Sequence, residues 1–149
     1  MCGIAGLIHR GKSSNVGTEL QQMLQALKHR GPDSTGYALY AENDGENFIM
    51  RFKVGENVGE GSTSVNEDVS VYDQRKKLVD RMLSELGARI VKEERLTPYS
   101  FRYEMKYGVK LSMEFSKKIE SIESVEILSI GKSLELIKDL GDAKVVCDR

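Results

Sequence analysis

The chain has 149 residues, of which 40% are hydrophobic and 30% are charged, a composition typical of a folded domain and too apolar for a disordered one. Its 22 basic and 23 acidic residues nearly cancel, which argues against nucleic acid and membrane surfaces as partners. No apolar run approaches the roughly 20 residues that span a bilayer, and no signal-peptide pattern is present, so we expect a cytoplasmic protein. The two cysteines and two histidines lack the spacing of zinc ligands, and we expect no metal and no cofactor.

The first elements are predicted from hydrophobic spacing. Residues 3–9 form an apolar run typical of a buried strand that begins directly after Cys2. Residues 18–28 are predicted to be a helix, with capping-box spacing at its start and one apolar face made by Leu20, Met23, Leu24 and Leu27. The capping pair is Thr18 and Gln21. Apolar segments at 36–41 and 47–54 flank Asn43-Asp44-Gly45, whose turn chemistry predicts a β-hairpin.

A Gly/Ser-rich stretch at residues 57–68 predicts a linker, which separates a first part, 1–56, from an α/β lobe, 69–149. In the lobe we expect a helix from Asp73 as N-cap to Gly87, strands at 89–94 and 99–107, and a strand end followed by a helix over 109–122. A strand at 124–130, a helix at 133–140 and a strand from Ala143 should follow, with Cys147 buried in the last strand. Because that strand runs to the last residue without a turn, we expect the lobe to end in mid-structure.

Cys2 has a special chemical position. Removal of the initiator methionine leaves this cysteine with a free α-amino group, so that one residue carries both a nucleophile and a base. An α-amino group titrates near ~8 and a thiol near ~8.5, which allows the amine to accept the thiol proton near neutral pH. Taken alone, a cysteine at this position is more often incidental than catalytic.

The surrounding motifs carry a family resemblance. The segment Met1-Cys2-Gly3-Ile4-Ala5-Gly6-Leu7-Ile8 is followed by an amphipathic helix and then by Leu27-Lys28-His29-Arg30-Gly31-Pro32-Asp33-Ser34-Thr35-Gly36-Tyr37. In order, spacing and chain position this closely resembles the opening of class II, N-terminal-nucleophile glutamine amidotransferase domains. The Pro-Asp form of the loop and its continuation look most similar to the glutamate synthase-type amidotransferase subunit, with asparagine synthetase-type glutaminases as the nearest alternative.

The resemblance implies an α+β fold, namely the N-terminal part of a four-layer αββα arrangement with an inserted α/β lobe. It implies that Cys2 is the catalytic nucleophile and that Arg30, Gly31 and Asp33 belong to a loop supporting the glutamine site. Glutamine would be the substrate, and a synthase domain or subunit would accept the ammonia. His29 and Arg30 also fit a simpler role, in which they satisfy carbonyls at the end of a helix.

Two motifs of the family are missing from this sequence. It contains neither the His-Thr-Arg segment, whose arginine binds the glutamine carboxylate, nor an Asn-Gly pair for the oxyanion hole. Gly141-Asp142 resembles a substrate-binding pair of some members but precedes the place of the missing motifs, so we interpret it as a helix stop. Two hypotheses therefore stay open, a glutaminase fragment completed by further chain or by another polypeptide, and a non-catalytic partner- or effector-binding module with a remnant N-terminus.

Overall fold

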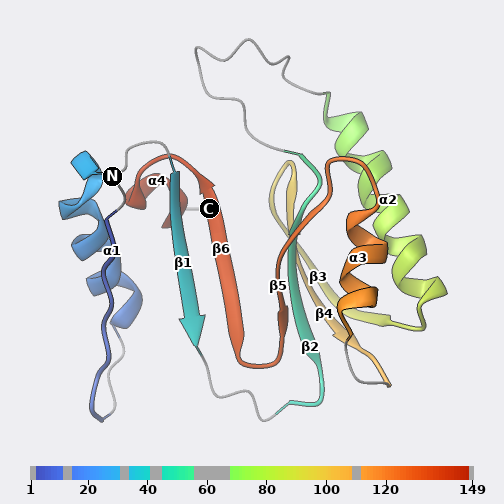
Figure 1. Ribbon diagram of the computed structural model, residues 1–149, viewed down its shortest axis with the longest axis horizontal. Coiled ribbons are helices and arrows are strands. Elements are labelled where there is room, and N and C mark those ends of the chain that lie inside the picture. Colours follow the sequence, from blue (N-terminus) through green and yellow to red (C-terminus); the bar gives the residue numbers. More distant parts are fainter. Residues whose placement is uncertain are drawn as a thin grey trace. The chain divides into compact units, whose positions relative to one another are not determined.

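The computed structural model describes residues 3–11, 15–30, 34–40, 45–55, 68–108 and 112–147 (Figure 1). These residues form four α-helices, one short 3₁₀ helix and six strands, which confirms the predicted α+β class. The chain divides into two compact units, a terminal unit made of Met1–Tyr37 and Lys138–Arg149, and a central unit, Ala38–Ile137. The four-layer arrangement and the division at 57–68 stay predictions, since residues 57–67 lie outside the described part.

The central unit is built around a four-stranded antiparallel sheet with the order β3-β4-β2-β5. Along the chain its elements alternate as strand, helix, strand, strand, helix, strand, which is the split β-α-β arrangement. They are β2 (Phe48–Lys53), α2 (Val69–Glu85), β3 (Arg89–Thr97), β4 (Ser100–Lys106), α3 (Met113–Glu120) and β5 (Glu126–Gly131).

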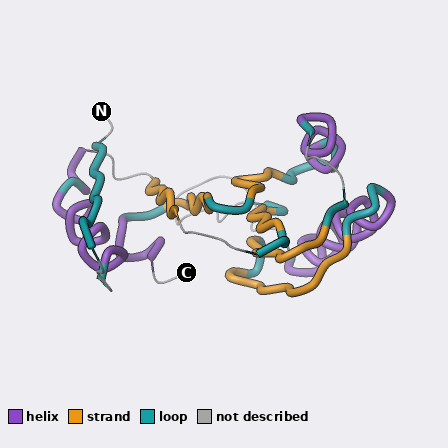
Figure 2. Tube along the Cα trace, turned by 90° about the horizontal axis from the view of Figure 1, so that it is seen from below, coloured by secondary structure: helices purple, strands orange, loops and turns teal. Residues whose placement is uncertain are grey.

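The core of the central unit lies between one face of this sheet and the two helices. Strand β4 buries Phe101, Tyr103 and Met105 in strict alternation, and α2 and α3 cover the face to which they belong (Figure 2). Phe52 on β2 lies opposite Phe101, with their ring centroids 5.4 Å apart. The predicted half-buried aromatic strand is therefore confirmed, and its apolar face supplies most of the sheet's share of the core.

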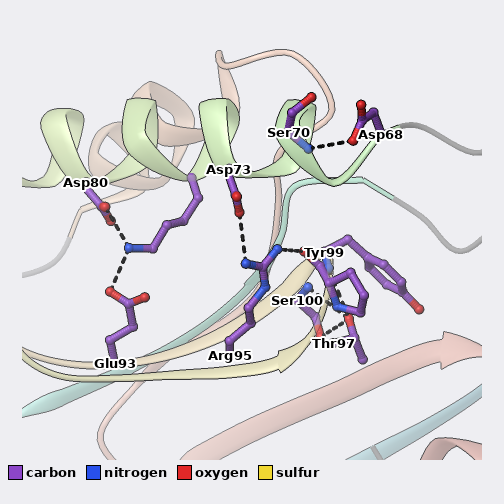
Figure 3. Close-up of polar contacts among 11 residues, drawn as sticks. Asp68, Ser70, Asp73, Asp80, Glu93, Arg95, Thr97, Tyr99 and Ser100 are labelled. Atoms are coloured by element: carbon purple, nitrogen blue, oxygen red, sulfur yellow. Dashed lines mark hydrogen bonds and ion pairs between the residues drawn. The ribbon is translucent and has the colours of Figure 1, made fainter.

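Ion pairs fasten α2 to the sheet (Figure 3). The ammonium of Lys76 lies 3.0 Å from a carboxylate oxygen of Asp80 and 2.7 Å from one of Glu93, and Arg95 lies 2.9 Å from Asp73. The predicted N-cap, Asp73, is therefore wrong. Asp68, five residues earlier, caps the helix instead and accepts a hydrogen bond from the backbone N–H of Ser70 at 3.1 Å.

The terminal unit contains α1 (Val16–Ala26), the 3₁₀ helix η1 (Lys28–Arg30) and α4 (Ala143–Cys147), and α1 packs against α4. Strands β1 (Ser34–Tyr40) and β6 (Leu134–Leu140) pair in a two-stranded sheet and carry the chain across the boundaries between the units. The helix predicted at 18–28 is confirmed with a shifted start. Asn15, not Thr18, precedes it, and no side-chain hydrogen bond caps it. No described helix is long and apolar enough to cross a membrane.

Two predictions for the first part of the chain are wrong, although the strands expected at 36–41 and 47–54 are present as β1 and β2. Residues 3–9 form no strand, because they have no ladder partner among the described residues. The hairpin expected around residues 43–45 is absent as a pairing, since β2 takes β4 and β5 as neighbours and β1 takes β6. Residues 41–44 themselves lie outside the described part. Strand β2 pairs with β4 because this places Met50 and Phe52 opposite aromatic residues of the core. That burial decides the pairing in place of the local turn sequence.

The last two elements exchange their predicted types. Residues 134–140 form a strand instead of the expected helix, because pairing with β1 overrides their ambiguous spacing. The segment from Ala143 forms a helix instead of a strand, since the Asp142 carboxylate accepts a hydrogen bond from the N–H of Val145 at 3.1 Å and starts a helical turn. Cys147, expected to be buried, is consequently exposed at the end of that helix.

Candidate functional site

The predicted site residues fall at the edge of what the structure describes. Cys2, Gly31 and Asp33 lie outside the described residues, whereas Arg30 ends η1 and is exposed. The structure therefore describes the immediate neighbour of each group, Gly3 after the predicted nucleophile and Arg30 before the predicted loop. Whether Cys2 and Asp33 meet at one site stays a prediction.

Gly3 lies against the turn that leads from α1 into the predicted loop. A β-carbon placed on Gly3 would stand 3.1 Å from Cβ of Leu27 and 3.7 Å from Cβ of Arg30. The turn is held by backbone hydrogen bonds from Leu27 to the carbonyl of Leu24 and from Arg30 to the carbonyl of Leu27, both 2.9 Å. Only a residue without a side chain fits this approach unshifted, so the glycine after Cys2 keeps the N-terminal segment beside Arg30.

A second contact fixes the other end of this segment. Nε2 of His9 lies 3.0 Å from a carboxylate oxygen of Glu19 in the first turn of α1. Because Gly3 lies at the Leu27 end of α1 and His9 at the Glu19 end, residues 3–9 run along the helix in the opposite direction to it. The predicted nucleophile segment is thus positioned by a helix and not by a sheet in the described part of the chain.

The side chains of His29 and Arg30 have no hydrogen-bonding or ionic partner among the described residues. Both are exposed, and the contacts within η1 are made by the backbone. The guanidinium of Arg30 is therefore accessible to solvent. A guanidinium in this setting can bind a carboxylate or support a neighbouring loop.

A polar cluster that the sequence did not indicate joins α1, β1 and α4. The side-chain amide of Gln25 donates to Asp142 at 3.1 Å and accepts from the backbone N–H of Lys144 at 3.2 Å. The Thr35 hydroxyl donates to the carbonyl of Gly141 at 2.8 Å, and the buried Tyr37 hydroxyl donates to the carbonyl of Ala143 at 2.6 Å. The cluster ties the start of α4 to the rest of the terminal unit.

Asp142 has a structural role in this cluster. Hydrogen bonds from Gln25 and from the N–H of Val145 lower the pKa of this carboxyl below its ordinary value, so it is ionised near neutral pH. Each of its carboxylate oxygens accepts one of these bonds. Gly141-Asp142, interpreted above as a helix stop, in fact begins a helix. The signal that could have found this is an Asp with N-cap spacing before residues 143–147.

The central unit holds one further charged cluster. Glu135 accepts hydrogen bonds from Arg51 at 2.6 Å and from two nitrogens of Arg102 at 2.9 and 3.0 Å, and Arg102 also reaches Glu94 at 3.2 Å. Burial raises the pKa of Glu135, but the bonds from Arg102 and Arg51 outweigh burial and lower it overall. Each charged side chain of the cluster has a partner of opposite charge within it. We therefore interpret the cluster as a structural contact that stabilises the sheet. Among the described residues no group of three or more His, Cys, Asp or Glu is placed to hold a metal ion.

Comparison with known proteins connects the N-terminal segment to a family. Residues 1–56 match the family described as "Glutamine amidotransferase domain". The whole chain is 34% identical, over an alignment of 162 positions, to a protein of Methanothermobacter thermautotrophicus named "Putative glutamine amidotransferase". The chain covers 46% of that relative, so it spans less than half of the relative's length. The chain is therefore similar to glutamine amidotransferases, and the match to their domain falls on the segment that holds Cys2 and the turn at Arg30.

Proposed function

We propose that this chain provides the nucleophile-bearing part of a class II, N-terminal-nucleophile glutamine amidotransferase. It would hydrolyse glutamine and supply ammonia to a synthase domain or subunit of the glutamate synthase type. The observation that carries the proposal is the close packing of Gly3 on Leu27 and Arg30, inside the segment that matches the amidotransferase domain. That packing supports a site in which the residue before Gly3 lies near the loop that follows Arg30.

The proposed reaction uses Cys2 twice. Once Met1 is removed, the α-amino group of Cys2 takes the proton of its own thiol, and the thiolate attacks the carboxamide carbon of glutamine. The C–N bond breaks, the nitrogen takes up the proton, and ammonia leaves a thioester behind. Water then hydrolyses the thioester to glutamate and restores the thiol. Arg30, Gly31 and Asp33 would support the loop beside the bound glutamine.

The proposal also requires groups that this sequence does not contain. Without the His-Thr-Arg and Asn-Gly motifs, the chain lacks the expected ligand of the glutamine carboxylate and an expected oxyanion donor. Loss of one oxyanion donor typically lowers the rate by ~10²- to 10³-fold. We therefore expect very slow turnover by the 149-residue chain alone, and faster turnover when a polypeptide carrying these motifs is present.

Covalent labelling tests the proposal. An electrophilic analogue of glutamine should modify Cys2 in the presence of a polypeptide that carries the missing motifs, and excess glutamine should protect it. Cys147, the exposed second cysteine, offers a matched control, since Cys147→Ser should label as the unchanged chain does and Cys2→Ser should not. Intact mass should show that Met1 is absent. Retention of Met1, or labelling that glutamine does not slow, would favour the non-catalytic module.

A further inference from the structure

The helix that precedes the predicted glutamine-site loop is held in its last turn by a distant part of the chain. The side-chain amide of Gln25 donates to the Asp142 carboxylate at 3.1 Å and accepts from the backbone N–H of Lys144 at 3.2 Å. Gln25 lies next to the last residue of α1, just before η1 and Arg30. The start of α4 therefore holds the end of α1 from which the chain turns into the loop.

The strand that follows the loop is held by the same part of the chain. The Thr35 hydroxyl donates to the carbonyl of Gly141 at 2.8 Å, and the buried Tyr37 hydroxyl donates to the carbonyl of Ala143 at 2.6 Å. Thr35 is the second residue of β1. Residues 141–144 thus contact the chain on both sides of the predicted loop, where α1, β1 and α4 come together (Figure 1).

The turn at the start of α4 is fixed by contacts of its own. Gly141 has a φ of 116°, which side chains rarely adopt, and an added β-carbon would stand 3.1 Å from Cγ1 of Val145. The Asp142 carboxylate accepts a hydrogen bond from the N–H of Val145, and Ala143 and Val146 are buried. The turn therefore has one preferred conformation, as an anchor for a loop requires.

The turn at Arg30 connects this anchor to the segment that follows the predicted nucleophile. The N–H groups of Leu27 and Arg30 close the turn directly after Gln25. A β-carbon added to Gly3 would stand 3.1 Å from Cβ of Leu27 and 3.7 Å from Cβ of Arg30. The start of α4, the turn and Gly3 thus form one series of contacts, which ends one residue from Cys2 in the sequence.

We propose that the start of α4 positions the glutamine-site loop, with Thr35 and Asp142 as positioning residues for glutamine binding. The inference rests on the proposed function. A loop whose two ends are already held loses less conformational freedom when a ligand orders it, so these contacts strengthen glutamine binding without touching glutamine. Gly141-Asp142 thus acts through the loop and not as a substrate-binding pair.

Two reagents for Cys2 test this role, with Cys147→Ser as the background and a polypeptide that carries the missing motifs present. A diazoketone analogue of glutamine reports on the glutamine site, and iodoacetamide reports on the thiol alone. Thr35→Val should weaken protection by glutamine about fivefold, which is what one hydrogen bond contributes. Its reaction with iodoacetamide should stay unchanged, because that reagent does not bind the loop.

Two further variants sharpen the test. Thr35→Ser is the matched control, because it keeps the hydroxyl and should keep the glutamine protection of the unchanged chain. Asp142→Ser tests the other end of the loop, since its single oxygen can still cap α4 but the oxygen that accepts from Gln25 is lost. We expect it to weaken glutamine protection about threefold, because the bond from Lys144 to Gln25 remains.

Hydrogen exchange supplies a readout that does not involve Cys2. The amide of Arg30 should exchange at least about threefold faster in Asp142→Ser than in the unchanged chain, because the end of α1 is then held less firmly. Equal exchange in the two proteins would contradict the role of α4 in holding the turn.

Three labelling results would overturn the inference. They are unchanged glutamine protection in Thr35→Val, protection in Thr35→Ser as weak as in Thr35→Val, and an iodoacetamide reaction that changes as much as the protection does, since the fold would then be lost in general. The two proposals fail differently. Absence of glutamine-protected labelling in the unchanged chain would contradict the proposed function, whereas protected labelling that Thr35→Val leaves unaltered would contradict only the positioning role.

Discussion

The two units of the molecule differ in how many hydrophobic side chains they bury. The central unit encloses one continuous cluster of fourteen buried residues between its sheet and its two helices. In the described part of the terminal unit the buried hydrophobic residues are Tyr37, Ala143 and Val146, while Ile4 and Ile8 are almost fully exposed. The central unit supplies a large core, whereas the described part of the unit that carries the predicted nucleophile buries few hydrophobic residues.

This difference suggests that the central unit acts as a scaffold and that the predicted site belongs to the terminal unit. The packed residues of the central unit satisfy one another through aromatic contacts and ion pairs, which is what a scaffold requires. The terminal unit has an accessible arginine, Arg30, and two exposed isoleucines, Ile4 and Ile8, in the segment that follows the predicted nucleophile in the sequence. Four substitutions test this contrast, from the largest expected effect to the smallest.

Phe52→Ala should have the largest effect. Phe52 is fully buried on a central strand and contacts the rings of Phe101 and Tyr103, so its truncation should cost about 3 to 5 kcal/mol of unfolding free energy. Leu24→Ala on the half-buried face of α1 should cost about 1 kcal/mol. Denaturant unfolding measures both. If the variant does not fold, Phe52→Leu provides a milder test, and equal costs at Phe52 and Leu24 would contradict the contrast.

Tyr103→Phe should have the next largest effect. The Tyr103 hydroxyl donates to the Asp80 carboxylate at 2.6 Å, and a hydrogen bond to a charged group contributes about 1.5 to 3 kcal/mol. Tyr107→Phe is the control, because the ring of Tyr107 packs on Phe115 and its hydroxyl has no partner among the described residues. Unfolding curves at neutral pH should separate the two variants.

The same tyrosine predicts an alkaline limit to stability. Burial, followed by the hydrogen bond to Asp80, raises the pKa of Tyr103 well above its ordinary value of 10.0. Above about pH 10 the unfolded chain loses this proton while the folded chain retains it, so the free energy of unfolding falls as pH rises. Tyr103→Phe should flatten that decline. If the free energy of unfolding of Tyr103→Phe fell with pH as steeply as that of the unchanged chain, other groups would be responsible for the fall.

Gly3→Ala should disturb the terminal unit alone. Its new β-carbon would stand 3.1 Å from Cβ of Leu27, and the resulting shift should slow glutamine-protected labelling of Cys2 about tenfold. Gly6→Ala is a close control, since nothing lies within 4 Å of its added carbon among the described residues. Equal labelling rates in the two variants would show that the approach of Gly3 to the Arg30 turn does not position Cys2.

Gln25→Ala should have the smallest effect. It removes two hydrogen bonds that hold α4 on α1, and we expect a loss of about 1 kcal/mol, seen as faster amide exchange in residues 143–147. Gln22→Ala changes an exposed glutamine of the same helix and should leave that exchange unchanged. Faster exchange in β4 as well would mean that the change spreads beyond the terminal unit.

The sequence predicted those elements whose hydrophobic periodicity is regular and which pack in the core of the central unit. The stripe of α2 and the alternation of β4 were both confirmed, because one pattern repeats along each element. The strands predicted at 89–94 and 124–130 were confirmed as β3 and β5, whereas the type of residues 133–140 and the partners of β2 were mispredicted, since tertiary pairing decides them. At the site, motifs indicated Cys2 and Arg30. The bond between Gln25 and Asp142 joins residues 117 positions apart, which no local pattern encodes.

Hydrogen exchange of the 149-residue chain alone, resolved along the sequence, tests the contrast between the units most directly. The account predicts slow exchange in β2 and β4, whose amides open to solvent only when the central unit unfolds, and exchange in residues 3–9 close to that of an unstructured peptide. Protection of residues 3–9 as strong as that of β4 would contradict it, because the segment that follows the predicted nucleophile would then be held as firmly as the core of the central unit.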